Sequence, residues 1–196
     1  MILGAILLAF CCWAFTFGLE WGNFWIKIGL SVIILCLYSF RWQRPVVRFR
    51  YNSVMIGILS AAVLYGIFSL GNALSSYIIA NAGYQIGGIY ELGKGSNRVL
   101  IFLLLCFITG PGEEIFWRGF LQEKLIHQFG NSAGFILATL IYAGVHVFSM
   151  NLMLVFAALV AGAFWGGLYL WKKDLGLVIV SHALWSAFIF AVFPLR

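Results

Sequence analysis

Residues 99–121 read VLIFLLLCFITGPGEEIFWRGFL, an apolar run interrupted by Gly110-Pro-Gly112, by two adjacent glutamates and by one arginine. The part before the interruption rises only about 16 Å as an α-helix, which is too short to cross a bilayer. The span therefore either ends in mid-membrane or continues with Glu113, Glu114 and Arg118 inside it. An ionised side chain at the centre of a membrane helix costs about 2.5 to 3.5 kcal/mol on insertion scales, so such residues indicate a function.

Helical geometry gives the two glutamates different surroundings. Glu114 and Arg118 are four residues apart and share a face, so they can form an ion pair. Glu113 is turned about 100° away and projects elsewhere, which leaves its carboxylate unpaired. Pro111 is suited to the first turn of a helix, where the helix dipole favours negative charge. The alternative is that both glutamates are solvated at the membrane surface.

The whole chain has the composition of a membrane protein. Of its 196 residues, 63% are apolar and 9% are charged, and the mean hydropathy is +1.02. The charged fraction is roughly a third of that in a soluble domain. This composition excludes separate soluble catalytic, nucleotide-binding or nucleic-acid-binding domains. The net charge of +6 comes from basic residues at the ends of apolar runs, which is typical of membrane anchors.

Seven apolar runs are separated by charged or Gly- and Asn-rich segments. They are Ile2–Leu19, Phe24–Phe40, Val54–Ala80, Val99–Leu125, Ala133–Met150, Leu152–Trp171 and Leu175–Phe193. Because a spanning helix needs about 20 apolar residues, we expect an all-α, multi-pass transmembrane bundle of about seven helices. The Gly-rich segment Asn81–Asn97 is expected to be an external loop.

The distribution of Lys and Arg predicts the orientation. One set of alternate loops holds Arg41, Arg44, Arg48, Arg50, Arg118, Lys124, Lys172 and Lys173, and the other holds Lys27, Lys94, Arg98 and Arg196. Cytoplasmic loops carry the excess of basic residues, so the first set and the N-terminus are predicted to face the cytoplasm of a cell membrane.

Two histidines lie within apolar runs. His146 is in the fifth run, and His182 is in the seventh, where Ser186 shares its face one turn later. Polar side chains need partners away from lipid, so these residues and Glu113 are expected to share one polar cavity. Counting residues along each helix predicts that this cavity opens towards the cytoplasm. His127, in the predicted cytoplasmic turn, is expected to be structural or solvated.

Three motifs follow one another in these spans: Glu113-Glu114-x-x-x-Arg118, Tyr142-x-x-x-His146 and His182-x-x-x-Ser186. In order and spacing they resemble the CPBP intramembrane protease family, which includes the CAAX prenyl endopeptidases of the Rce1 type and the bacterial Abi proteins. The resemblance covers roughly residues 108–190. The family has Phe at the position of Tyr142, and Asn or Asp at the position of Ser186. By this resemblance residues 99–196 would be the catalytic core, and residues 1–98 the N-terminal helices with the external loop.

The resemblance implies an intramembrane endopeptidase. Glu113 or Glu114 would activate a water with the help of His146, while His182 and Ser186, supported by Tyr142, would hold the substrate carbonyl or the developing oxyanion. Because Arg118 can neutralise Glu114, we favour Glu113 as the base. Family members are often called metalloproteases, and a divalent ion such as Zn²⁺ would then be bound by His146 and His182.

The expected partners are the lipid bilayer and a membrane-associated peptide, and no nucleic acid is expected. The substrate could be a CAAX-like tail, a bacteriocin leader or another membrane peptide. Two other functions stay open. A non-catalytic scaffold or immunity-type protein would explain Ser186, and a small proton-coupled transporter would use Glu113 and the histidines as a relay.

Overall fold

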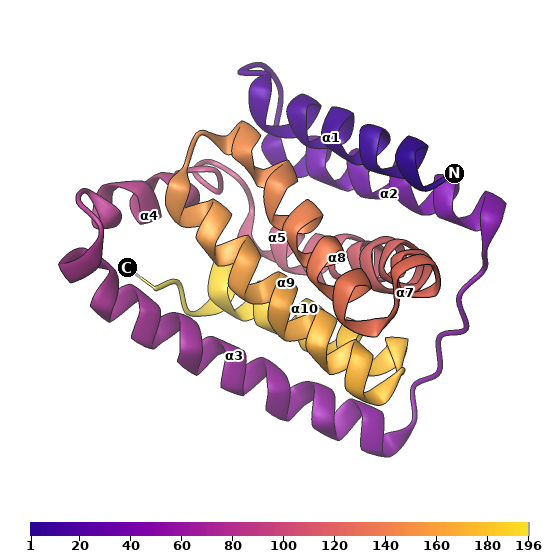
Figure 1. The fold of residues 1–196 in the computed structure, drawn as a ribbon. Helices are drawn as coiled ribbons and strands as arrows, with labels where there is room; N and C mark the ends of the chain where they lie inside the picture. Colours follow the sequence, from indigo (N-terminus) through magenta and orange to yellow (C-terminus); the bar gives the residue numbers. More distant parts are fainter. Residues whose placement is uncertain (196) are drawn as a thin grey trace.

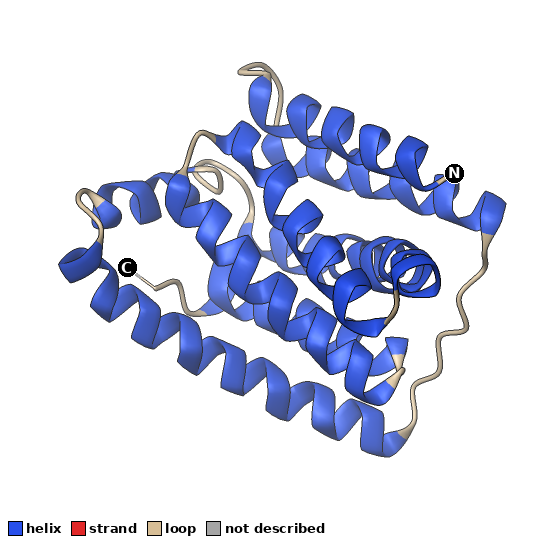
Figure 2. Cartoon of the chain, viewed as in Figure 1, coloured by secondary structure: helices blue, strands red, loops and turns tan. Residues whose placement is uncertain are grey.

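A computed structural model describes residues 1–195, which are almost entirely helical and contain no strand within that range (Figure 2). The first helices are α1 (Ile2–Gly18), α2 (Phe24–Trp42), α3 (Tyr51–Ile78) and α4 (Ala82–Glu91). One continuous helix follows, made of α5 (Arg98–Leu104), the π-helical η1 (Leu105–Thr109), α6 (Gly110–Phe116), the π-helical η2 (Trp117–Gln122) and α7 (Glu123–Phe129). The last are α8 (Asn131–Val145) with the 3₁₀ turn η3 (His146–Ser149), α9 (Leu152–Lys172), and α10 (Leu175–Ala187) with the π-helical η4 (Phe188–Val192).

The expected membrane bundle is confirmed. Six of the described helices are long and apolar enough to cross a bilayer: Phe24–Trp42, Tyr51–Ile78, Arg98–Phe129, Asn131–Ser149, Leu152–Lys172 and Leu175–Val192. The helix Ile2–Gly18 is apolar but shorter, with 17 residues. These seven correspond to the seven apolar runs. The helix Arg98–Phe129 continues through the interruption, so Glu113, Glu114 and Arg118 lie in the middle of a span.

The segment Asn81–Asn97 differs from its prediction as a loop, because it contains the helix α4. This short helix is held against the start of α9. Asn151 Nδ2 donates to the carbonyl of Gln85 over 2.7 Å, and the backbone N–H of Met153 donates to Gln85 Oε1 over 3.1 Å. The glycines of the segment predict a loop, but packing against α9 stabilises a helix there. Arg196, which the orientation count includes, lies outside the described residues.

Several helices begin at residues that cap them. Asn23 and Asn97 accept hydrogen bonds from the first N–H groups of α2 and α5, and Asn151 and Asp174 do the same for α9 and α10. A cap satisfies backbone donors that the helix itself cannot pair, which matters where no water is present. The capping residues therefore fix where these four helices begin.

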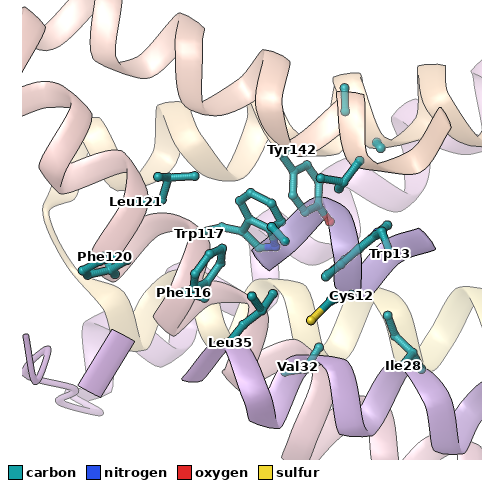
Figure 3. Close-up of a cluster of buried hydrophobic side chains, with 14 of the residues drawn as sticks. Cys12, Trp13, Ile28, Val32, Leu35, Phe116, Trp117, Phe120, Leu121 and Tyr142 are labelled. Atoms are coloured by element: carbon teal, nitrogen blue, oxygen red, sulfur yellow. The ribbon is translucent and has the colours of Figure 1, made fainter. Parts of the chain in front are cut away.

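The helices that carry the charged residues lie in the centre of the bundle. In Figure 1, α1 and α2 form one face, α3 forms the opposite face, and α8, α9, α10 and the helix Arg98–Phe129 lie between them. α3 packs closely on α10, because a Cβ at Gly57 would meet the carbonyl of Leu177 at 2.9 Å. On the other side, Trp13 of α1 reaches into a buried cluster beside Trp117 and Tyr142 (Figure 3). The first three helices of the chain thus help to enclose the central helices.

Candidate functional site

Small residues allow other helices to approach the two glutamates closely. A Cβ at Gly110 would meet the Cα of Ala183 on α10 at 2.8 Å, and a Cβ at Gly112 would overlap Val32 on α2. The π-helical segments η1 and η2 flank α6 on its two sides. Such segments widen one turn of a helix and are frequent at functional sites. The helix therefore presents Glu113 and Glu114 between α2 and α10 without a break in the chain.

Glu114 is fully buried and forms the ion pair that its spacing from Arg118 predicts. Its Oε1 atom accepts a hydrogen bond from Arg118 Nη1 over 2.7 Å and lies 2.7 Å from His182 Nδ1. Arg118 Nη2 also donates to the carbonyl of Gly162 on α9 over 3.2 Å. The pair therefore joins the helix Arg98–Phe129 to α9 and α10. Breaking a buried pair of this kind typically costs about 3 to 5 kcal/mol.

His182 is held on two sides. Because a carboxylate only accepts hydrogen bonds, the contact with Glu114 places a proton on His182 Nδ1. The imidazole stacks on the indole of Trp165, with 3.8 Å between the ring centroids and 15° between the planes. Trp165 Nε1 donates in turn to Ser181 over 3.2 Å. Trp165 has no signal in the sequence that marks it as part of the site, because an aromatic residue in an apolar span usually indicates packing.

Glu113 projects away from the ion pair, as helical geometry predicts. Its Oε2 atom accepts a hydrogen bond from the hydroxyl of Tyr142 over 3.1 Å. The ring of Tyr142 also lies under the guanidinium of Arg118, 4.7 Å from its central carbon. One carboxylate is thus paired with an arginine, while its neighbour is paired with a neutral hydroxyl.

His146 lies at the end of α8, with both ring nitrogens engaged. Its Nδ1 atom is 2.8 Å from the carbonyl of Tyr142, and its Nε2 atom accepts from the indole Nε1–H of Trp13 over 3.2 Å. Trp13 belongs to α1 and is 1% exposed. No local pattern in the sequence marks this residue, because its partner is 133 positions away.

These side chains converge on one cavity of about 120 Å³. Its polar wall consists of Glu113, Tyr142, His146, His182 and Ser186, together with Thr109. A water occupies about 30 Å³ in the liquid, so the cavity has room for a few waters. The Glu114–Arg118 pair lies outside this wall and supports it through His182. His127 is exposed at the end of α7 and stays apart from the cavity.

The cavity extends towards the α4 end of the bundle. Its apolar wall includes Phe24 at the start of α2, Leu92 just after α4 and Leu154 at the start of α9. These positions lie at the end opposite the connection 43–50 (Figure 1). The prediction that the cavity opens towards the cytoplasm stays a prediction. Counting depth along parallel helices does not allow for tilt or for the helix α4, which adds a wall at this end.

The histidines do not fit the metal site that the resemblance implies. Both nitrogens of His146 have partners in the protein, and His182 Nδ1 faces Glu114. Within residues 1–195, no group of three His, Cys, Asp or Glu side chains is arranged to hold a metal ion. A catalytic zinc site needs three such ligands with their lone pairs directed at one point. The arrangement observed is instead a hydrogen-bonded set around a small cavity.

Comparison with known proteins agrees with the motifs in this cavity. The family model described as type II CAAX prenyl endopeptidase Rce1-like matches residues 95–188, the part of the chain that carries Glu113, Glu114, Arg118, Tyr142, His146, His182 and Ser186. Searches of curated proteins and of solved structures found no match. Residues 95–188, a little under half of the chain, are therefore similar to the type II CAAX prenyl endopeptidases of the Rce1-like family.

Proposed function

We propose that this protein hydrolyses a peptide bond of a membrane-associated substrate with a water that Glu113 activates. The observation that supports this proposal is the meeting of Glu113, Tyr142, His146, His182 and Ser186 in one cavity inside a membrane bundle. A carboxylate and two imidazoles around space for a few waters provide the groups for general acid–base catalysis.

The two glutamates have separate roles in this proposal. Glu114 is neutralised by Arg118 and orients His182, so it supports the site without touching the substrate. Glu113 faces the cavity and receives only the Tyr142 hydroxyl, so one of its oxygens can accept a hydrogen bond from water. As the water oxygen bonds to the carbonyl carbon, its proton moves to Glu113. When the C–N bond breaks, Glu113 returns a proton to the leaving amine.

His182 and Ser186 are proposed to bind the substrate carbonyl. They lie one turn apart on α10, and both line the cavity. The Ser186 hydroxyl can donate to the oxygen that becomes negative in the tetrahedral intermediate. His146, which also lines the cavity, would assist the proton transfers. No step of this mechanism requires a metal ion.

The substrate is proposed to be a peptide anchored in the membrane, either a CAAX-like tail or a leader-type peptide. The cavity walls are apolar apart from the catalytic groups, and the surrounding helices expose large apolar side chains to lipid. A substrate could therefore arrive laterally from the bilayer. We also propose that the protein resides in the cell membrane with its N-terminus in the cytoplasm, as its basic residues favour.

The experiment is hydrolysis of a library of membrane-anchored peptides by the purified protein in liposomes, followed by mass spectrometry. Glu113→Gln keeps the size and the hydrogen bond to Tyr142 but removes the base, so cleavage should be lost while the protein stays folded. Glu20→Gln, at an exposed position outside the helices, is the matched control and should cleave like the parent. Equal cleavage by Glu113→Gln and the parent would contradict the mechanism. Full complementation of a deletion by Glu113→Gln would favour the scaffold function instead.

A further inference from the structure

The indole of Trp13 lies against the candidate site from outside the family-matched segment. Its ring contacts that of His146 edge-on, with 5.7 Å between the ring centroids and 71° between the ring planes. It also contacts the ring of Trp117 edge-on, with 5.7 Å between the centroids and 82° between the planes. Trp13 is a residue of α1 that belongs to the buried cluster of Figure 3, with Trp117 and Tyr142. The segment 95–188 therefore receives part of its site from the first helix.

The hydrogen bond from Trp13 determines which nitrogen of His146 carries the proton. An indole N–H can only donate, so His146 Nε2 must accept and must be without hydrogen. The proton of the neutral ring is then on Nδ1, which donates to the carbonyl of Tyr142. The two bonds hold the ring in one orientation and in one tautomer, with the Nε2 lone pair directed at the indole N–H of Trp13.

This bond is not a general consequence of burying tryptophan. The indole N–H groups of Trp25, Trp117 and Trp185 are buried with no hydrogen-bond partner in the described chain. The position of Trp13 is also fixed independently, one turn further along α1. There the hydroxyls of Thr16 and Ser31 are 2.8 Å apart, and both hydroxyls contact the carbonyl of Cys12. This polar junction ties α1 to α2 and holds the indole in place.

We infer that Trp13 is a positioning residue, which sets the tautomer and orientation of His146 for the hydrolytic reaction. The inference rests on the proposed function, since it assigns His146 a part in proton transfer. Without the indole N–H, Nε2 can carry the proton itself, and the ring can turn from the Tyr142 carbonyl. Losing one neutral hydrogen bond changes such a preference by about fivefold.

The test is the ¹⁵N NMR spectrum of histidine-labelled protein, in which the chain contributes only three histidines. The signal of His146 is identified by its loss in His146→Asn. In the parent, the ring nitrogen of His146 that carries no hydrogen should be Nε2. In Trp13→Phe, the Nε2–H form should become detectable, and kcat for the anchored peptide should fall about fivefold with KM unchanged. Trp13→Leu, which also has no side-chain hydrogen-bond donor, replaces Trp13→Phe if that variant does not fold.

Trp117→Phe is the matched control, because Trp117 is equally buried, contacts the rings of Trp13 and Tyr142, and has an indole N–H without a partner in the described chain. Its His146 spectrum should be that of the parent. An unchanged tautomer in Trp13→Phe, or an equal change in Trp117→Phe, would overturn the inference, as would a changed tautomer with parental kcat. The spectrum needs no substrate, so it reports on His146 even if the peptide assay contradicts the proposed function.

Discussion

The hydroxyl of Tyr142 donates to Glu113 Oε2 over 3.1 Å, while the carbonyl of the same residue is 2.8 Å from His146 Nδ1. One residue of α8 therefore orients both a carboxylate and an imidazole of the candidate site. A Phe, which the resemblance described above places at this position in the family, could hold the histidine through its carbonyl but could not bind the glutamate. Tyr142 is thus a local difference with a chemical consequence.

Replacing Tyr142 with Phe should reduce the rate of hydrolysis by about fivefold, because a free Glu113 carboxylate is less well oriented and one net hydrogen bond is lost. The ring and its contact with Arg118 remain, so the protein should fold. The measurement is the initial rate on an anchored peptide in liposomes. Tyr38→Phe removes a hydroxyl that donates to the Met1 carbonyl, far from the cavity, and is the control. A parental rate in Tyr142→Phe would show that this bond has no catalytic role.

The buried pair of Glu114 and Arg118 should determine stability rather than only the rate. Glu114→Gln leaves a buried arginine without its counter-ion, and Arg118→Met leaves a buried carboxylate, so each should destabilise the protein by about 3 to 5 kcal/mol. The double variant should lose much less than the sum, because no charge is then left unpaired. The measurement is thermal unfolding of the four proteins in detergent. Additive losses would mean that the two side chains do not act as a pair.

Ser186 can be tested by restoring the residue that the resembling family has. Its side chain is buried and lines the cavity. Ser186→Ala should lower kcat at least tenfold. Removing one oxyanion donor from an enzyme typically lowers kcat by about 100- to 1000-fold. The expected loss is smaller here because the hydroxyl is one of two candidate donors. Ser186→Asn supplies an amide donor with longer reach and should retain more activity than Ser186→Ala. The comparison of kcat and KM for the three proteins is the measurement. Identical kcat values would remove Ser186 from the oxyanion site.

The sequence predicted those parts of the structure that depend on local periodicity. Hydrophobic runs separated by charged or Gly- and Asn-rich segments predicted the spans, and the spacing of Glu114 and Arg118 predicted their ion pair. The separate direction of Glu113 follows from the same geometry. Because polar groups in lipid must find one another, His146 and His182 were also expected near Glu113, and the structure brings all three to one cavity.

Features that depend on contacts between distant segments could not be read in this way. The bond between Trp13 and His146 joins residues 133 positions apart, and a tryptophan in an apolar run usually predicts packing. The helix α4 is stabilised by Gln85 through Asn151 and Met153, which are not its neighbours in sequence. The α4 end of the cavity depends on the same contacts, because Leu92 just after α4 is part of its wall. The stacking of Trp165 on His182 likewise required the packing of α9 against α10.

The glycines of α9 provide a last test of how closely this helix must approach the site. Gly162 lies where a Cβ would meet Tyr142 Cδ1 at 2.9 Å, and its carbonyl accepts from Arg118. A Cβ at Gly167, on the same helix, would meet no atom within 4 Å. Gly162→Ala should therefore lower the stability by about 1 to 3 kcal/mol, the usual cost of overpacking. Gly167→Ala should be neutral or stabilising by up to about 1 kcal/mol, because alanine is the better helix former.

Thermal unfolding and the hydrolysis rate should be measured together for the two alanine variants. In Gly162→Ala, α9 must move from α8, which displaces the Tyr142 ring and lengthens the bond from Arg118, so the rate should fall with the stability. Gly167→Ala should keep the parental rate, since it faces open space. Equal stability and equal rate in both variants would mean that α9 is free to shift. The close contact between Gly162 and Tyr142 would then not be what holds the ring, and with it Glu113, in position.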